Sequence, residues 1–369
     1  MMFDVDHQIG RYAAAERLGR ARVPNAAIQA FGLEAFSALG YPSRIEHSGE
    51  LWRYHDVMQD GRFSRNLRLI GEPSAEVLAV AQRAIDAVVS FSESRFQFKS
   101  AAKDMLSRAI YQFQLISNEL KATPRPWSIL EIGPGCGYLG LLVGLAGDRY
   151  TAVEASQAFY VYQSTLYRDV FGDDYQDGLE HTATSRIGHL PWWELCRESS
   201  RLPAFTAATA NHMLSEMNSS GLAFLFGKLY TTQSSQFRVI AESLGSQPIN
   251  TYGSVVQNIS NQRFSAHEQS KNFWVFRPAS EKPVIQRIRV TYHERARRFI
   301  LRKYLVIRSL PIVGTIIRLI VVSLKGLVRK GAPPSSSRET IKPVSSLTAM
   351  FAPYADFESA EYRFQKRSW

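Results

Sequence analysis

Cysteine is scarce in this chain of 369 residues, which contains only Cys136 and Cys196. Two isolated cysteines allow no disulfide framework, and no run of Cys, His, Asp or Glu has the spacing of a metal site. The first residues, MMFDVDHQ, carry two aspartates and no following apolar run, so they do not resemble a secretory signal. These absences exclude a disulfide-stabilised secreted protein and predict a cytoplasmic chain without a bound metal.

Acidic side chains are nearly missing from one segment of an otherwise balanced sequence. Residues 287–330 contain twelve Lys or Arg and one acid, Glu294, which gives them the same net charge as the whole chain, +11. The remaining residues are therefore neutral, and 45 % of the chain is hydrophobic, which is enough for a packed core. A neutral body with one basic segment does not favour general nucleic-acid binding.

The basic segment also lacks an uncharged stretch long enough to cross a bilayer. Its longest uncharged run is 309–317, whereas a spanning helix needs ~20 mostly apolar residues. As a helix from Pro311 onward, it places Lys and Arg on a narrow stripe beside broad apolar faces. This pattern is typical of a helix that lies on an anionic membrane surface, and it predicts a peripheral position on the inner membrane. The alternative is a helix packed on the catalytic domain or on a second subunit.

Strand and helix patterns alternate in the central part of the chain. Predicted helices lie at 74–92, 101–120, 139–146, 159–171 and 222–230, and predicted strands at 128–133, 150–154, 206–210, 237–242, 263–267 and 272–276. The last two strands are close in sequence and should pair antiparallel. The order predicts an α/β fold, a Rossmann-like doubly wound and mostly parallel sheet with an antiparallel edge strand.

Composition and breaks divide this prediction into four regions. Residues 1–122 form an N-terminal, mostly helical cap, and residues 123–280 form the α/β domain. Residues 281–330 form the basic amphipathic helices, and residues 331–369, which begin with GAPPSSSRET, form a linker and tail.

Glycine is concentrated where the first predicted strand meets its helix, in ILEIGPGCGYLG, residues 129–140. The loop fits both the dinucleotide pattern, Gly135-x-Gly137-x-x-Gly140, and the pattern of S-adenosylmethionine-binding loops, Glu131-x-Gly133-x-Gly135-x-Gly137. Glu131 favours the second pattern, because a carboxylate there suits a ligand that carries an amino group and a sulfonium. An NAD-dependent oxidoreductase is the alternative.

Four stretches together resemble one family: LEIGPGCGYLG, YTAVEASQAFYVYQ, HLPWW and TANHMLSEMN, within roughly residues 98–278. The combination resembles the sugar O-methyltransferases of bacteria, in the class I methyltransferase superfamily. The resemblance implies S-adenosylmethionine as cofactor, with Glu131, Gly133, Gly135 and Gly137 around its methionine part and Glu154 on its ribose. It also implies a small-molecule or glycan acceptor with a reactive hydroxyl group.

Four further side chains are candidates for the same site. His212 is a candidate base for the proton of the acceptor hydroxyl, and Glu216 would share its helix face and orient it. Asn211 is a candidate contact to cofactor or substrate, and Trp192 to the adenine ring. The structural alternatives are helix caps for Asn211 and His212, a solvated carboxylate for Glu216 and a core position for Trp192.

The predicted function is therefore an S-adenosylmethionine-dependent O-methyltransferase. Besides the oxidoreductase, the other alternative is a methyltransferase-like scaffold that binds cofactor without turnover. No pattern in the chain points to an oligomeric state.

Overall fold

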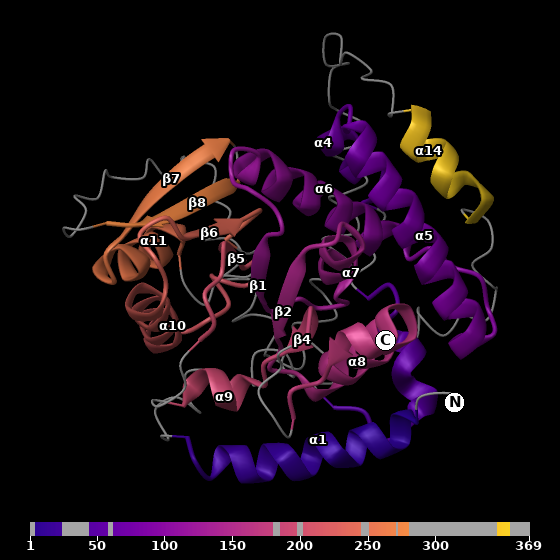
Figure 1. The fold of residues 1–369 in the computed structure, drawn as a ribbon, viewed down its shortest axis with the longest axis horizontal. Helices are drawn as coiled ribbons and strands as arrows, with labels where there is room; N and C mark the ends of the chain where they lie inside the picture. Colours follow the sequence, from indigo (N-terminus) through magenta and orange to yellow (C-terminus); the bar gives the residue numbers. More distant parts are fainter. Residues whose placement is uncertain are drawn as a thin grey trace, which may run out of the picture. The chain divides into compact units, whose positions relative to one another are not determined.

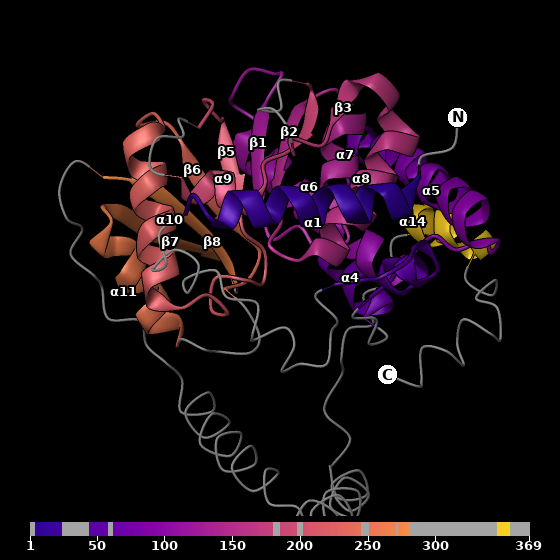
Figure 2. The same cartoon turned by 90° about the horizontal axis from the view of Figure 1, so that it is seen from below.

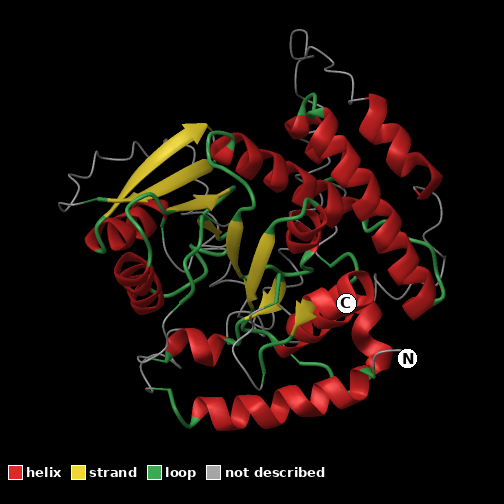
Figure 3. Ribbon diagram, viewed as in Figure 1, coloured by secondary structure: helices red, strands yellow, loops and turns green. Residues whose placement is uncertain are grey.

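The computed structural model describes residues 4–23, 44–57, 62–179, 185–197, 202–244, 251–270, 272–279 and 345–354. Figure 3 shows which of these residues form helices, strands and loops. The basic segment 287–330 lies outside the described residues, and so do the predictions made for it. None of the helices in the described ranges is long and apolar enough to cross a bilayer.

Eight strands form a single sheet in the order β3-β4-β2-β1-β5-β6-β8-β7 (Figure 1). The strands are β1 Ser128–Ile132, β2 Arg149–Val153, β3 Tyr175–Gln176, β4 Ile187–His189, β5 Ala207–Thr209, β6 Arg238–Ala241, β7 Phe264–Ser270 and β8 Phe273–Pro278. All neighbours are parallel except β8, which runs antiparallel to both β6 and β7. The predicted fold class is confirmed; β3 and β4 were not predicted because two or three residues show no periodicity.

The strand order reverses direction at β1, in the middle of the sheet. The chain moves from β1 to β2 on one side and later returns to β5 on the other, so Glu131 of β1 lies between Ala152 and Thr209. In open parallel sheets, ligands bind outside the carboxyl ends of the strands at such a reversal. The loops after β1, β2, β5 and β6 are therefore the place to look for a site.

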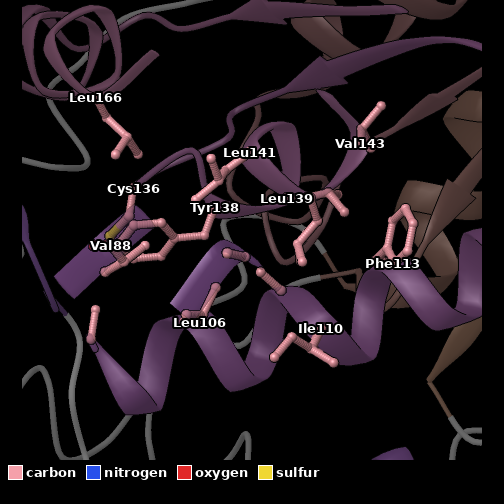
Figure 4. Packing of buried hydrophobic residues seen from close by; sticks show 14 of the residues in the cluster. Val88, Leu106, Ile110, Phe113, Cys136, Tyr138, Leu139, Leu141, Val143 and Leu166 are labelled. Carbon is pink, nitrogen blue, oxygen red and sulfur yellow. The ribbon is translucent and has the colours of Figure 1, made fainter. Parts of the chain in front are cut away.

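Three helices pack tightly beside the central strands. They are α5 Ala75–Phe96, α6 Lys103–Leu120 and α7 Tyr138–Leu145, and α7 contacts both of the others and β2. Because α7 is covered in this way, its apolar side chains are buried all round rather than along one stripe. Figure 4 shows α6 contributing Leu106, Ile110 and Phe113 to the core that also holds Cys136, Tyr138 and Leu139. This packing anchors the helix that follows the glycine loop.

The remaining helices near the sheet are α4 Phe63–Ile70, α8 Gln157–Phe171, α9 Trp192–Cys196, α10 Ser219–Thr232 and α11 Tyr252–Asn261, with short 3-10 turns at Ser48–Tyr54 and Gly172–Asp174. Helix α10 packs against α11, which contacts β7, and α4 packs against α6. The helices predicted at 74–92, 101–120, 139–146, 159–171 and 222–230 correspond to α5, α6, α7, α8 and α10.

The first helix, α1 Val5–Arg20, lies in the region predicted as a mostly helical cap, but no range was predicted for it. It begins after Asp4, whose side chain caps it, and it contacts α8 and α9 (Figures 1 and 2). Its buried face carries Gln8, Tyr12 and Glu16 as well as Val5, so the sequence shows no apolar period there. Two of the polar side chains on that face have partners in the fold: Gln8 Nε2 lies 3.4 Å from an Asp177 carboxylate oxygen, and Glu16 pairs with Arg44 (2.5 Å).

Residues 345–354, which the sequence places in a linker and tail, form helix α14 Ser345–Phe351 and a 3-10 turn, Ala352–Tyr354. Leu347 and Phe351 are buried in the same hydrophobic core as α5. The Phe351 ring meets the Phe63 ring edge-on, with 5.0 Å between their centroids. This part of the predicted tail is therefore an ordered piece of the folded core.

Candidate active site

The glycine loop after β1 turns through three residues with positive φ, Gly133 (+69°), Gly135 (+59°) and Gly137 (+79°). Only glycine adopts this backbone region without strain. A Cβ atom on Gly137 would lie 2.6 Å from the Tyr167 hydroxyl, so that glycine is required by packing. A Cβ on Gly135 would meet no atom within 4 Å. The main chain at Gly135 therefore borders open space that a ligand can fill.

Glu131 is buried near the end of β1, with 3 % of its surface exposed. Its carboxylate accepts a hydrogen bond from the Tyr150 hydroxyl (2.6 Å) and one from the Asn211 side chain. Burial raises the pKa of Glu131 to about 7. The nearby charge of Glu154 also raises it, whereas the two hydrogen bonds lower it. No Lys, Arg or His of the described ranges forms an ion pair with it. Hydrogen bonds therefore compensate its burial only in part, and the raised pKa reflects this.

Glu154 follows β2 and lies across the loop from Glu131. It is 5 % exposed, and the Ser156 backbone N–H donates to its Oε1 (2.8 Å). Burial raises its pKa to about 7, although backbone N–H groups of Ser156, Gly135 and Ala155 favour the ionised form. Glu154 also has no ion-pair partner among the residues that the structure describes. Two buried and unpaired carboxylates therefore flank one glycine loop.

The segment after β5 brings Asn211 and Met213 against these groups. The Asn211 side chain donates to Thr209 Oγ1 (2.9 Å) and accepts from the Glu242 backbone N–H (2.9 Å). The Met213 side chain lies 3.3 Å from the position of a Cβ on Gly133. Asn211 thus connects the ends of β5 and β6 to Glu131. Its contact with cofactor or substrate stays a prediction.

His212 has a positive φ of +63°, which is uncommon for a residue with a side chain. Its backbone N–H donates to the Ser243 carbonyl (3.0 Å), and its Nε2 lies 2.6 Å from Glu242 Oε2. Arg108 on α6 donates to both Glu242 oxygens, from Nε (2.8 Å) and Nη2 (2.5 Å). Burial works against ionisation of Glu242, but the hydrogen bonds and charges of His212 and Arg108 outweigh it and hold the pKa of Glu242 below its ordinary value.

The structure corrects the predicted role of Glu216 as the partner that orients His212. Residues 211–216 form turns rather than a helix, so positions four apart do not share a face. Glu242 is the carboxylate that contacts His212 instead. Glu216 is mostly buried, and burial raises its pKa to about 7.

Trp192 begins α9 and is 4 % exposed. The Arg20 guanidinium of α1 lies over its ring, 5.8 Å from the centroid, and the neighbouring Trp193 packs against Tyr12. These contacts put Trp192 in the core, which was the structural alternative to a contact with adenine. A contact between Trp192 and adenine stays a prediction.

Sequence reasoning missed Arg108 and Glu242. Glu242 ends the predicted strand 237–242, and the carboxyl end of a parallel strand next to the reversal point was a signal that could have identified it. Arg108 lies within a long amphipathic helix, where one more basic residue has no distinguishing pattern. Within the described ranges, no group of three or more His, Cys, Asp or Glu side chains is arranged to hold a metal ion.

Strand order, the antiparallel β8 and the glycine loop make this a Rossmann-like α/β protein. No protein-family model matches the chain, and no curated protein matches it. Solved structures do align with it at the level of architecture.

A TehB-like SAM-dependent methyltransferase from Corynebacterium glutamicum is 12 % identical, over 45 % of this chain and 84 % of its own, with a TM-score of 0.33. The glycopeptide N-methyltransferase MtfA, complexed with S-adenosylmethionine, is 11 % identical over 46 % of this chain and 92 % of its own, with a TM-score of 0.34. Geranyl diphosphate C-methyltransferase from Streptomyces coelicolor is 15 % identical over 42 % and 61 %, with a TM-score of 0.33. At this level of likeness no substrate or reaction carries over to this chain.

Proposed function

We propose that this chain is an S-adenosylmethionine-dependent methyltransferase. The observation that carries the proposal is the pair of buried carboxylates, Glu131 and Glu154, on either side of open main chain at Gly135. S-adenosylmethionine offers an ammonium group for the first carboxylate and a ribose diol for the second. NAD also offers a diol, but it has no ammonium group to compensate Glu131.

The residues present fit this cofactor. When bound, S-adenosylmethionine supplies a methyl group on a positively charged sulfur. Glu131 would hold the methionine end, Glu154 would accept hydrogen bonds from the ribose hydroxyls, and Gly133, Gly135 and Gly137 would let the ligand approach the main chain. The N-terminus of α7 follows directly and has its first backbone N–H groups free of helical partners.

We further propose that the methyl group goes to a hydroxyl of a sugar or glycoconjugate. Support comes from His212, whose Nε2 faces Glu242 and whose Nδ1 has no hydrogen-bond partner among the described residues. His212 Nε2 also lies 2.6 Å from Arg108 Nη2, which can only donate. In the tautomer in which Nε2–H donates to the Glu242 carboxylate, Nδ1 carries the lone pair. With the cofactor bound as methyl donor, Nδ1 would be the atom that accepts the proton of the acceptor hydroxyl during methyl transfer.

Calorimetric titration with S-adenosylhomocysteine and with NAD tests the cofactor. We expect S-adenosylhomocysteine to bind and NAD not to bind. Gly135→Ala should weaken S-adenosylhomocysteine at least about tenfold, because its methyl group enters the open space. Gly147→Ala is the matched control, since Gly147 also has positive φ and an open Cβ position but lies in the turn between α7 and β2. Binding of NAD alone would favour the oxidoreductase.

Release of S-adenosylhomocysteine from S-adenosylmethionine, measured with nucleotide sugars and lipid-linked sugars as acceptors, tests the transfer. With an active acceptor, we expect His212→Ala to lower kcat by about 10²- to 10⁴-fold with cofactor affinity within twofold of the native protein. Cofactor binding without turnover on any hydroxyl acceptor would favour the inactive scaffold. Full activity of the His212→Ala protein would remove the base from the mechanism.

A further inference from the structure

A chain of buried side chains connects β4 to the glycine loop. His189, the first residue of the HLPWW stretch, ends β4 and is fully buried. Its Nε2 lies 2.6 Å from Gln163 Oε1 on α8. Gln163 Nε2 in turn donates to the Gly135 carbonyl (2.6 Å) and lies 3.4 Å from Glu154 Oε2. The Gln163 side-chain amide thus links His189 to the Gly135 carbonyl and to the Glu154 carboxylate.

The partners determine the direction of each hydrogen bond in this chain. The Gly135 carbonyl can only accept, so Gln163 must turn its amide nitrogen toward it and its oxygen toward His189. Nε2 of His189 must then carry the proton. The other ring nitrogen, Nδ1, faces two hydroxyl groups, Tyr175 at 2.9 Å and Ser164 at 3.5 Å, and these two hydroxyls also bond to each other (2.8 Å). A neutral imidazole with its proton on Nε2 therefore offers an acceptor to the hydroxyls and a donor to Gln163.

The surroundings keep this imidazole neutral and fully buried. Burial lowers the pKa of His189 to about 3, against a smaller opposite effect of Asp177. The ring lies between Tyr160 and Tyr167, with centroid distances of 4.4 and 5.6 Å and interplanar angles near 30°. The Tyr167 hydroxyl itself donates to the Gly137 carbonyl (2.7 Å). Two carbonyls of the glycine loop are therefore held from α8.

We infer that His189 is a positioning residue, which orients Gln163 so that Glu154 and the Gly135 carbonyl stay in the geometry that receives the ribose diol. This inference rests on the proposed function, because it assumes that Glu154 binds that diol. In this inference His189 does not itself contact the ligand. Its effect is confined to the part of the cofactor that bears the two hydroxyl groups.

The affinities of S-adenosylhomocysteine and of its 2′,3′-dideoxy analogue separate this effect from a general loss of structure. In the native protein, the ratio of the two affinities should be about ten- to a hundredfold, as expected for hydrogen bonds to a carboxylate. In Gln163→Leu and His189→Leu, the ratio should fall at least about fivefold, because Glu154 loses its orienting partner. His189→Gln, which keeps an N–H donor, should retain part of the ratio.

Ile187→Val is the matched control, since Ile187 is buried in the same strand but does not belong to this series of hydrogen-bonded side chains. It should lower the melting temperature and leave the ratio unchanged. If the native protein shows the ratio and Glu154→Gln abolishes it, while both leucine variants keep it, the inference is wrong and the proposed function stands. If the native protein does not bind S-adenosylhomocysteine, both are wrong.

Discussion

Buried carboxylates at the site differ in how the fold compensates their charge. Glu242 is held as an anion by Arg108 and His212, whereas Glu131 and Glu154 receive only hydrogen bonds, so burial raises the pKa of both to about 7. Ionising a buried group without a counter-charge lowers the free energy of unfolding. We interpret this cost as the consequence of keeping both carboxylates available for a ligand.

Glu131→Gln should therefore stabilise the protein without ligand at high pH. A carboxyl whose pKa is raised by folding lowers the free energy of unfolding as pH rises from its ordinary value of 4.5 through about 7. The substitution removes this dependence, so its effect should be more stabilising at pH 8 than at pH 5, by about 1–3 kcal/mol. Urea denaturation at both pH values measures it. An equal effect at the two pH values would show that Glu131 is not the titrating group.

Glu242→Gln should act in the opposite direction. It leaves the Arg108 guanidinium, which is mostly buried, without its charge partner, and we expect a loss of about 3 kcal/mol in the free energy of unfolding. Adding Arg108→Met to Glu242→Gln should recover part of this loss, since the two residues are in contact. His212→Ala is the comparison, because its partly exposed ring should cost much less. Additive effects of Glu242→Gln and Arg108→Met would contradict the pairing.

The residues of the site that could be predicted lie close together in the sequence. Gly133, Gly135, Gly137 and Glu131 lie in one loop, where the spacing alone shows the turn and the acid. The partner of His212 could not be read in this way. Glu242 is thirty residues farther along and reaches His212 only because β5 and β6 are neighbours in the sheet.

At the scale of elements, α1 shows how a helix is held without an apolar face. Trp193 of α9 fills the place where a side chain at Gly19 would lie, with ring atoms 2.2 Å from the position of a Cβ. The helix therefore approaches α9 more closely than any other residue at this position would allow. The contact depends on an absent side chain, which periodicity does not reveal.

Gly19→Ala should destabilise the protein by about 1–3 kcal/mol, because the added methyl group overlaps the indole ring. The matched control is Gly10→Ala in the same helix, where a Cβ meets no atom within 4 Å. That change should stabilise the protein by about 0.5–1 kcal/mol through helix propensity. Thermal unfolding of both proteins measures the difference. Equal melting temperatures would mean that α1 does not pack on α9 as described.

At the scale of the molecule, the C-terminal part of the chain returns to its N-terminal half. Phe351 is 1 % exposed in the core that includes α5, and its ring contacts Phe63. Phe351→Ala should cost about 3–5 kcal/mol in the free energy of unfolding, as for other buried phenylalanines. Ala349→Gln on the exposed side of α14 should change stability by less than about 0.5 kcal/mol. Guanidinium titrations of the two variants provide the comparison; a native-like Phe351→Ala protein would show that α14 contributes nothing to the core.

The basic segment 287–330 carries the proposal of a membrane partner, which rests on the sequence. We expect the full chain to bind vesicles that contain anionic phospholipid and not neutral ones, with binding weakened by salt. Replacing Arg308, Arg318, Lys325 and Arg329 by glutamine should reduce binding strongly, at about 1 kcal/mol per charge. Co-sedimentation with vesicles measures this. Unchanged binding of the substituted protein would favour a helix packed on protein instead.

The sequence by itself determined helices α5, α6, α7, α8 and α10, the strands other than β3 and β4, the antiparallel end of the sheet and the position of the glycine loop. These features depend on residues near one another in the chain, where periodicity, caps and glycine spacing act directly. The tertiary structure alone decided the partners: Glu242 and Arg108 for His212, Gln163 for Glu154, and Phe63 for Phe351. Such contacts join residues that only the sheet order and the packing of the core bring together, and no local pattern encodes them.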